Sequence, residues 1–313
     1  MGRPPLRSHD DGRLDSGRRR RAVVLALALP GVLVLSGCSQ APDAQLKYGF
    51  LPVFEHDQTN STGKIIDLWV GSWIAALTVA VLVWGLMIWC MIAYRRRKNA
   101  TGLPVQTRYH IPIEILYTVV PIMMVGGLFY QTAGAQAKIV DHSAKPDLVI
   151  DVVAKQWSWD FHYTDAGVYE TGVQAQLTGK PGVQDTLPPL YLPVDKRVEF
   201  HITSRDVIHS FWIPAFLFKL DAIPGVMNTY QVVPHRAATY QGKCSELCGE
   251  YHSEMLFNVK VVSQQEYDQH MAELRAKGQT GDLPTNLGRE KTGKGRGNVP
   301  FNPENAVTEG TKR

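Results

Sequence analysis

The chain has 313 residues, of which 44% are hydrophobic, 20% charged and 9% aromatic, a composition that excludes disordered and fibrous proteins and suits about two domains. The net charge of +4 is too balanced for a nucleic-acid binder without a concentrated basic patch, and no basic run has the interleaved aromatic residues of such a patch. The mean hydropathy of −0.14 averages three apolar segments with polar ones. These apolar segments decide the class of protein.

The first apolar segment, residues 22–36, follows four consecutive arginines and is 15 residues long, too short to span a bilayer but typical of a signal peptide. It runs into the sequence LSGC at residues 35–38, which resembles the lipobox of bacterial lipoproteins, where cleavage leaves a lipid-bearing cysteine. We therefore expect residues 1–37 to be removed, Cys38 to carry a lipid and residues 38–63 to form an exported tether. An ordinary export signal with an incidental cysteine, or a twin-arginine signal, is the alternative.

The other two apolar segments, residues 68–94 and 115–137, contain 27 and 23 residues without a charge, enough for two membrane-spanning helices in a hairpin over residues 64–137. A buried hairpin of a soluble protein is disfavoured by these lengths. Up to residue 113 the connection carries only basic charges: Arg95, Arg96, Arg97, Lys98 and Arg108. By the positive-inside rule the connection is cytoplasmic and both long flanks lie outside, in agreement with a lipid on the outer face. Aromatic residues suited to the membrane interfaces flank the first span: Trp69, Trp73, Trp89 and Tyr94.

The sequence after the hairpin predicts an all-β sandwich or barrel of roughly 120 residues, at 143–262. Strand-like runs separated by turn residues occupy 148–154, 191–203, 228–233, 238–242 and 256–262. Ser263 and Glu266 form a capping-box pattern that predicts a helix over residues 263–277, which Gly278 ends. Residues 278–313 are poor in apolar residues and are interpreted as a disordered tail.

A cluster of soft metal ligands stands near the end of the β region. Cys244, Cys248, His252 and Met255 follow the spacing C-x3-C-x3-H-x2-M, and His209 supplies a second histidine from upstream. Adding a thioether to thiolate and imidazole favours copper over zinc. A mononuclear type 1 copper site needs one cysteine, so the second thiolate indicates a dinuclear centre bridged by both sulfurs. Such a centre has no open position for substrate and suits an electron relay.

Other interpretations explain fewer of these residues. A disulfide between Cys244 and Cys248 is plausible in an exported domain, but leaves the histidines and Met255 without a role. Structural zinc usually has paired C-x2-C units and disfavours methionine. The haem attachment signal C-x-x-C-H is absent. Cys90 lies in the middle of a predicted span and is interpreted as a packing residue.

The hairpin and the ligand motif together resemble subunit II of haem-copper cytochrome c oxidases over roughly residues 65–262. The most specific stretches are 156–159 (QWSW), 206–214 (DVIHSFWIP), 220–225 (LDAIPG) and 244–255. The resemblance implies an α+β membrane protein, with a two-helix transmembrane hairpin followed by an all-β cupredoxin (Greek-key β-barrel) domain that holds a dinuclear copper centre, CuA.

The resemblance also implies residue roles. Copper is bound by the side chains of His209, Cys244, Cys248, His252 and Met255 and by the backbone carbonyl of Glu246. The Glu246 carboxylate reaches a magnesium ion shared with subunit I, although by itself Glu246 reads as a solvated loop acid.

Two further residues have roles in the family outside the copper ligands. Trp157 matches the surface tryptophan where electrons enter from cytochrome c. An isolated tryptophan is more often a core residue, however, and either Trp157 or Trp159 could be the core residue. Glu114 matches the mouth of a proton channel, although an acid in the first turn of a helix is also favourable there.

These matches predict the electron-entry subunit of a bacterial cytochrome c oxidase in the plasma membrane. It takes electrons from cytochrome c and passes them to haem in subunit I, where oxygen is reduced and protons are pumped; subunits I and III are the expected partners, and the chain is inactive alone. His162 and Arg205 stand where many relatives carry acids that steer a soluble basic cytochrome c, which favours a tethered donor or one within a bc-type complex. A nitric-oxide reductase subunit, a nitrous-oxide reductase relay domain and a copper carrier are alternatives; a quinol oxidase subunit is disfavoured because those relatives lack the copper ligands.

Overall fold

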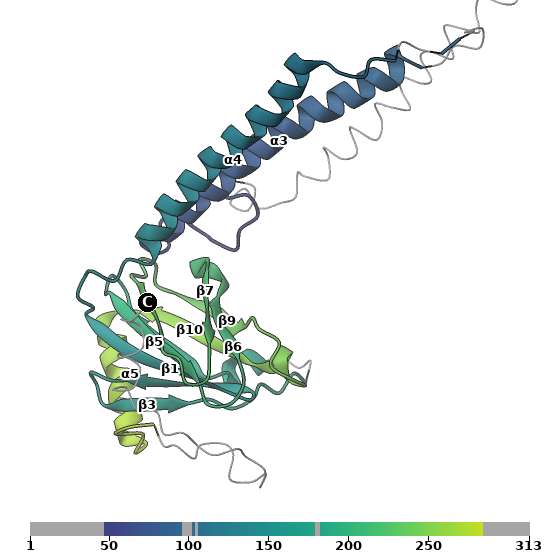
Figure 1. The fold of residues 1–313 in the computed structure, drawn as a ribbon. Helices are drawn as coiled ribbons and strands as arrows, with labels where there is room; N and C mark the ends of the chain where they lie inside the picture. The colour runs from purple at the N-terminus through teal and green to yellow at the C-terminus, as the bar shows by residue number, and fades with distance from the viewer. Residues whose placement is uncertain (1–46, 96–101, 104–105, 179–181, 284–313) are drawn as a thin grey trace, which may run out of the picture. The chain divides into compact units, whose positions relative to one another are not determined.

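The computed structural model describes residues 47–95, 102–103, 106–178 and 182–283 (Figure 1). The predicted signal peptide, Cys38, most of the basic connection between the apolar segments and residues 284–313 lie outside these ranges.

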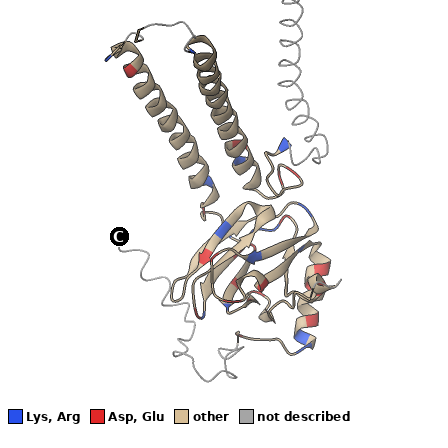
Figure 2. Ribbon diagram, turned by 90° about the vertical axis from the view of Figure 1, so that its right-hand side faces the viewer, with Lys and Arg blue, Asp and Glu red and all other residues tan. Residues whose placement is uncertain are grey.

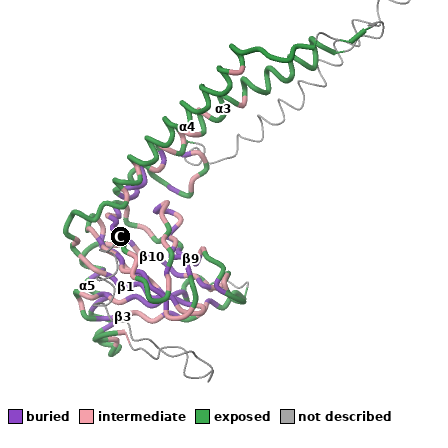
Figure 3. Tube along the Cα trace, viewed as in Figure 1, coloured by how far each residue is buried: buried purple, intermediate pink, exposed green. Residues whose placement is uncertain are grey.

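Two long helices cover the predicted membrane spans: α4 extends beyond its span at both ends, whereas α3 begins six residues before its span and ends one residue short of it. Helix α3 covers Thr62–Ala93 and helix α4 covers Ile111–Ile139, and both are long and apolar enough to cross a membrane. Charged side chains gather near the helix ends and are absent from the middle parts (Figure 2). Most residues of the two helices are exposed (Figure 3), as expected for surfaces that face lipid or other membrane subunits.

Two five-stranded sheets form the β domain. Strand β1 (Leu148–Lys155) lies between β2 (Ser158–Tyr163) and β5 (Val198–Ser204) in the first sheet, whose order is β3-β2-β1-β5-β8, with β3 at Val168–Thr171 and β8 at Asn228–Val232. The second sheet has the order β4-β10-β9-β6-β7, formed by β4 (Pro189–Pro193), β10 (Leu256–Val262), β9 (Ala238–Cys244), β6 (His209–Ile213) and β7 (Phe218–Ala222). Each sheet has one parallel pair, β1 with β5 and β10 with β4, among antiparallel ones. The predicted class, two apolar helices followed by an all-β domain, is confirmed.

Buried residues are concentrated in the β domain (Figure 3), and many of these core residues are aromatic. Trp159, Phe161 and Phe257 are fully buried, and Phe257 stacks on Phe211 with ring centroids 5.1 Å apart and an interplanar angle of 9°. Gly242 on β9 leaves room for this stack, because a Cβ there would lie 2.1 Å from the Phe257 ring. Core packing therefore fixes the inner faces of β2, β6, β9 and β10, the strands that border the ligand motif.

The structure corrects the sequence-based strand assignment in two respects. The run at 191–203, predicted as one strand, forms β4 and β5 in different sheets, and the turn between them includes Asp195 at a φ of 58°. Strands β2, β3, β6 and β7 were not predicted, because they are short and β2 places the charged Asp160 inside the protein. The burial of this carboxylate is compensated by the Lys155 ammonium at 2.7 Å.

Helix α5 (Gln264–Ala276) follows β10 directly, and the capping box predicted at Ser263 and Glu266 is present. Residues 279–281, which the sequence analysis placed in a disordered tail, hydrogen-bond to residues 167–169 beside β3. The backbone amides of Tyr169 and Gly281 donate to the carbonyls of Gln279 and Gly167. These bonds fasten the chain after α5 to the first sheet.

Candidate metal centre

Strand pairing brings the predicted ligands to one end of the second sheet. His209 is the first residue of β6 and Cys244 the last residue of β9, and the antiparallel register of these strands pairs Phe211 with Cys244. The loop after β9 carries Cys248 and His252, and Met255 directly precedes β10. Ligands that are 46 residues apart in the chain therefore meet.

The five side chains lie within contact distance of one another through their ligand atoms. Cys244 Sγ lies 3.8 Å from His209 Nδ1 and 3.8 Å from Cys248 Sγ. Cys248 Sγ in turn lies 3.5 Å from His252 Nδ1 and 3.9 Å from Met255 Sδ. The two sulfurs thus stand at the middle of the group, each with its own histidine. The group therefore offers one histidine on each side of the sulfur pair.

These separations fit donors that share a metal ion. With metal–sulfur bonds of about 2.3 Å and metal–nitrogen bonds of about 2.0 Å at tetrahedral angles, two donors of one ion stand roughly 3.5–3.8 Å apart. The sulfur–sulfur and sulfur–nitrogen distances fall at these values, whereas a disulfide would need a sulfur–sulfur bond of about 2.05 Å. Cys244 and Cys248 are free thiols. The geometry therefore fits metal ligation and does not fit the disulfide alternative.

Burial shields the group from water. His209 and Met255 are fully buried and the two cysteines nearly so, while His252 is partly exposed. His209, Cys244 and Cys248 together form a cluster able to hold a metal ion. A closed, soft-ligand pocket of this kind favours a tightly held ion over a readily exchanged one.

The two thiols differ in acidity. Burial raises the pKa of Cys244, but hydrogen bonds, first of all with His209, outweigh burial and bring it down to about 7. Burial and the neighbouring Cys244 sulfur raise the pKa of Cys248 to about 12. The pair therefore gives up its first proton readily and resists losing the second. Only a nearby positive charge allows both sulfurs to be thiolates, and a soft cation supplies that charge.

Asp206, to which the sequence analysis gave no role, supports the ligand His209 on the side of its ring away from the sulfurs. Its Oδ1 lies 2.8 Å from His209 Nε2, and its Oδ2 accepts a hydrogen bond from the Gln156 amide at 2.7 Å. Burial raises the pKa of the Asp206 carboxyl, but these hydrogen bonds outweigh burial and hold it below its usual value. The carboxylate fixes the ring orientation that leaves His209 Nδ1 facing the sulfurs. The sequence signal that could have identified Asp206 was its position three residues before the ligand His209.

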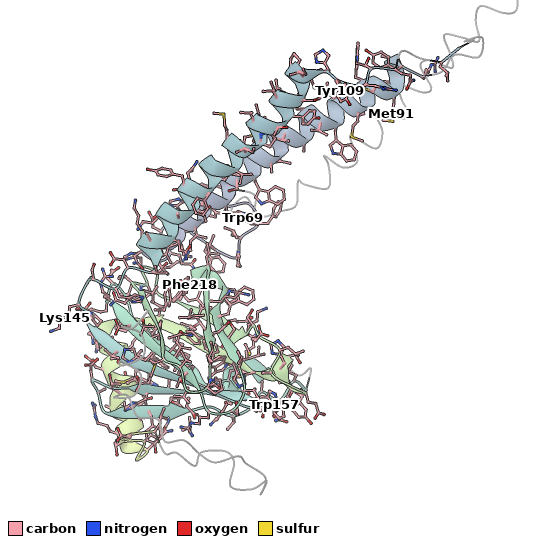
Figure 4. All side chains as sticks on the ribbon, viewed as in Figure 1. Trp69, Met91, Tyr109, Lys145, Trp157 and Phe218 are labelled. Atoms are coloured by element: carbon pink, nitrogen blue, oxygen red, sulfur yellow. The ribbon has the colours of Figure 1, made fainter. Side chains whose placement is uncertain are left out.

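Trp157 and Trp159 occupy different environments. Trp159 is a buried core residue, whereas Trp157, which precedes β2, is partly exposed and lies at the edge of the β domain (Figure 4). The Trp157 indole Nε1 donates to the Cys248 carbonyl at 3.2 Å, and its ring packs edge-on against Tyr251 with centroids 4.9 Å apart. Gln156 Nε2 donates to the same carbonyl at 2.9 Å. One indole thus connects the domain surface to a ligand residue.

Two of the predicted site residues show local contacts of other kinds. The Glu246 carbonyl accepts a hydrogen bond from Cys244 Sγ at 3.2 Å, and the Glu246 side chain is exposed. Glu114 lies in the first turn of α4, where its Oε1 accepts from the His110 amide at 3.0 Å. Glu114 therefore has the capping contact that an acid at this position favours, and it is not part of the ligand group.

Comparison with known proteins places the chain in one family. The family model described as "Cytochrome C oxidase subunit II, periplasmic domain" matches residues 148–262. A Streptomyces avermitilis protein named "Probable cytochrome c oxidase subunit 2" is 45% identical over 268 residues, which cover 76% of this chain and 83% of the relative. "Cytochrome c oxidase subunit 2" of Mycobacterium bovis is 32% identical over 253 residues, 66% of this chain and 70% of the relative.

Among solved structures, the periplasmic domain of subunit II of cytochrome oxidase from Bradyrhizobium japonicum is 34% identical, with a TM-score of 0.40 over 43% of this chain and 97% of that domain. The relatives of full length extend the similarity beyond the β domain into most of the chain. The chain therefore belongs to the cytochrome c oxidase subunit 2 family and is a component of a haem-copper terminal oxidase.

Proposed function

We propose that this subunit accepts electrons from cytochrome c at a dinuclear CuA centre and passes them to haem in subunit I, where oxygen is reduced to water and protons are pumped. The observation that carries the proposal is the buried group of two cysteines, two histidines and one methionine, whose ligand atoms stand at metal-sharing distances. Two bound copper ions would take up and release one electron within a frame that both sheets hold rigid.

Each ligand has a separate part in this proposal. The sulfurs of Cys244 and Cys248, the imidazoles of His209 and His252, the Met255 thioether and the Glu246 carbonyl would hold the copper ions, which would supply one-electron redox chemistry. Support comes from the pairing of each sulfur with its own histidine. The same burial disfavours a copper carrier, which needs an exchangeable site. The Glu246 side chain, exposed on the loop, is the proposed ligand of a magnesium ion shared with subunit I.

Trp157 is the proposed point of electron entry. Its partly exposed ring offers a flat π surface to a haem edge, and its hydrogen bond to the Cys248 carbonyl leads directly to a bridging ligand. Trp159, by contrast, is enclosed in the core. The proposed path therefore runs from the indole through the backbone of Cys248 to the sulfurs.

The electron donor is proposed to be tethered to the membrane or to belong to a bc-type complex. Where many relatives carry acids, this chain has His162 and Arg205, which pair with Asp151 at 3.0 Å and Asp160 at 3.7 Å respectively. The metal loop itself carries two exposed acids, Glu246 and Glu250, so support for this donor comes from His162 and Arg205 alone. A reduction rate by soluble basic cytochrome c that is steeply salt-dependent and near the diffusion limit would count against this donor.

The membrane arrangement is proposed from the sequence. Residues 1–37 act as a signal peptide, Cys38 carries the lipid, residues 38–63 form the tether, and residues 64–137 form a hairpin with both flanks on the outer face. The cupredoxin domain covers residues 143–262, helix 263–277 follows, and the tail begins after it. Glu114, at the basic end of the hairpin, is the proposed entry to a proton channel of subunit I; its half-buried carboxylate at a helix start supports the position.

The test of electron entry replaces Trp157 in the intact oxidase. Trp157→Phe keeps an aromatic ring but removes the hydrogen bond to Cys248, so electron transfer from reduced cytochrome c should slow while the copper spectrum is unchanged. Trp212→Phe, at a partly exposed tryptophan on β6, is the matched control and should transfer electrons at the parent rate. Equal rates for both variants would exclude Trp157 as the entry point.

A further inference from the structure

The loop of residues 48–54, before α3, carries aromatic side chains on its outside. Tyr48 and Val53 are buried, whereas Phe50 and Phe54 are 67% and 60% exposed. Gly49 and Phe50 have φ values of 63° and 64°, a left-handed conformation that bulky residues rarely adopt. Two such residues in succession reverse the chain and leave the Phe50 ring on the outside of the turn.

The side of α3 holds this turn in place. The Trp69 indole Nε1 donates to the Gly49 carbonyl at 2.9 Å, and a Cβ on Gly49 would lie 2.9 Å from the indole. Only glycine allows the loop to approach this closely. Trp69 in turn packs edge-on against Trp73, with ring centroids 5.7 Å apart. The loop and the first turns of α3 therefore form one aromatic surface.

The contact with Trp69 determines where along α3 the loop of residues 48–54 lies. Asp67 is the last charged residue before the uncharged run of 27 residues, and Trp69 comes two residues later, about 3 Å further along an α-helix. His56, which precedes α3, bonds to Asp67 at 2.9 Å. The turn at Gly49 and Phe50 thus stands where α3 passes from polar to apolar surface. In a spanning helix this level is the boundary between headgroups and hydrocarbon.

We propose that the loop of residues 48–54 is an interfacial membrane anchor, with Phe50 inserted among the phospholipids of the leaflet at the start of α3. The lipid-facing surface of the spanning helix continues directly into the loop through Trp69 and Gly49, and aromatic residues at this level are stabilised by the interface. Because Phe50 stands on a convex turn, it offers a protein partner little area but reaches lipid easily.

Two neighbouring features agree with a lipid partner. The Arg236 guanidinium lies 5.4 Å from the centre of the Phe54 ring and 2.7 Å from the Glu55 carboxylate, which places an ion pair beside the loop at the level where polar headgroups would lie. Cys38 precedes Tyr48 by ten residues, a reach of at most about 35 Å, so a lipid on Cys38 would hold the same stretch at the same leaflet. The inference requires that α3 spans the membrane and is independent of the copper chemistry.

Photocrosslinking in the intact oxidase in native membranes tests the anchor. Phe50, Leu82 and Val173 are each replaced by p-benzoylphenylalanine, which preserves an aromatic ring at position 50. Leu82, 62% exposed in the middle of α3, reports lipid contact, and Val173, 67% exposed in the β domain, reports a surface outside the membrane. We expect phospholipid adducts at positions 50 and 82 and none at 173, read by mass spectrometry.

Two outcomes overturn the proposal. An adduct between position 50 and another oxidase subunit would make the loop a protein interface. The absence of any adduct at position 50, with lipid adducts at 82, would place Phe50 in water. Both outcomes are read without any measurement of electron transfer, so they leave the proposed function unaffected.

Discussion

Replacing Asp206 by asparagine tests how the protein holds its metal ligands. Asp206 Oδ1 contacts His209 Nε2 at 2.8 Å and the Val207 amide at 2.7 Å, and Oδ2 accepts from the Gln156 amide at 2.7 Å. Asparagine has one oxygen, so in either orientation its NH₂ group faces an N–H donor. At least one hydrogen bond to a charged acceptor is lost, a cost of about 1.5–3 kcal/mol.

The loss should appear in copper binding as well as in stability. Removing the partner that orients a ligand histidine lowers metal affinity by about 10–100-fold. The assay is competition for Cu(I) with a chelator, on the full-length subunit in detergent, together with thermal unfolding of the copper-free protein. Asp221→Asn, at an exposed aspartate on the neighbouring strand β7, is the control. Parent-like affinity in Asp206→Asn would show that His209 needs no support from the carboxylate.

Three further changes test the packing of the β domain and of helix α5. Gly242→Ala should lower stability by about 1–3 kcal/mol, because its Cβ would lie 2.1 Å from the Phe257 ring, and thermal unfolding measures this loss. Burial lowers the pKa of His270 from 6.5 to about 4. As the pH drops from about 6.5 to 4, the unfolded chain binds this proton before the folded chain does, so the free energy of unfolding should fall by up to about 3 kcal/mol. His270→Phe should remove this part of the pH dependence. Ser263→Ala removes the cap on the Glu266 amide and should cost about 1 kcal/mol, seen as a lower Tm.

Exposed residues near each of these positions serve as controls. Thr239→Ala on the outer face of β9, His142→Phe before β1 and Gln265→Ala in the first turn of α5 should leave stability close to that of the parent, because all three side chains are exposed. A parent-like Tm in Gly242→Ala would contradict the close packing against Phe257. If the stability of His270→Phe depends on pH as steeply as that of the parent, other groups cause the loss of stability at low pH. If Ser263→Ala lowers Tm no more than Gln265→Ala does, the Ser263 cap does not stabilise α5.

Ligand identity was accessible from the sequence because the chemistry constrains it. Cys244, Cys248, His252 and Met255 lie within twelve residues, and no other pattern explains this combination. His209 was identified from the sequence as a second histidine upstream, but nothing local ties it to the cysteines until β6 pairs with β9. Soft ligands at fixed spacing can thus be recognised in the sequence, whereas their positions relative to one another in space depend on the strand register.

The supporting contacts could not be predicted in the same way. Asp206 and Gln156 act through hydrogen bonds between loops 50 residues apart, and no periodicity marks such pairs. The choice between Trp157 and Trp159 depended on where β2 begins, because the residue inside the strand is enclosed by the core and the one before it is not. Strand β2 was not predicted for a related reason. Its Asp160 is charged, and a buried carboxylate is tolerated only with a partner such as Lys155, which the sequence does not reveal.

Copper stoichiometry with electron paramagnetic resonance on the full-length, copper-loaded subunit tests the proposed relay most directly. Two copper ions per chain, with hyperfine coupling shared between both, are expected for the parent, and Cys248→Ser should lose this shared signal. One copper ion with a mononuclear spectrum, or no copper retained by the parent under reducing conditions, would contradict a dinuclear centre at Cys244 and Cys248.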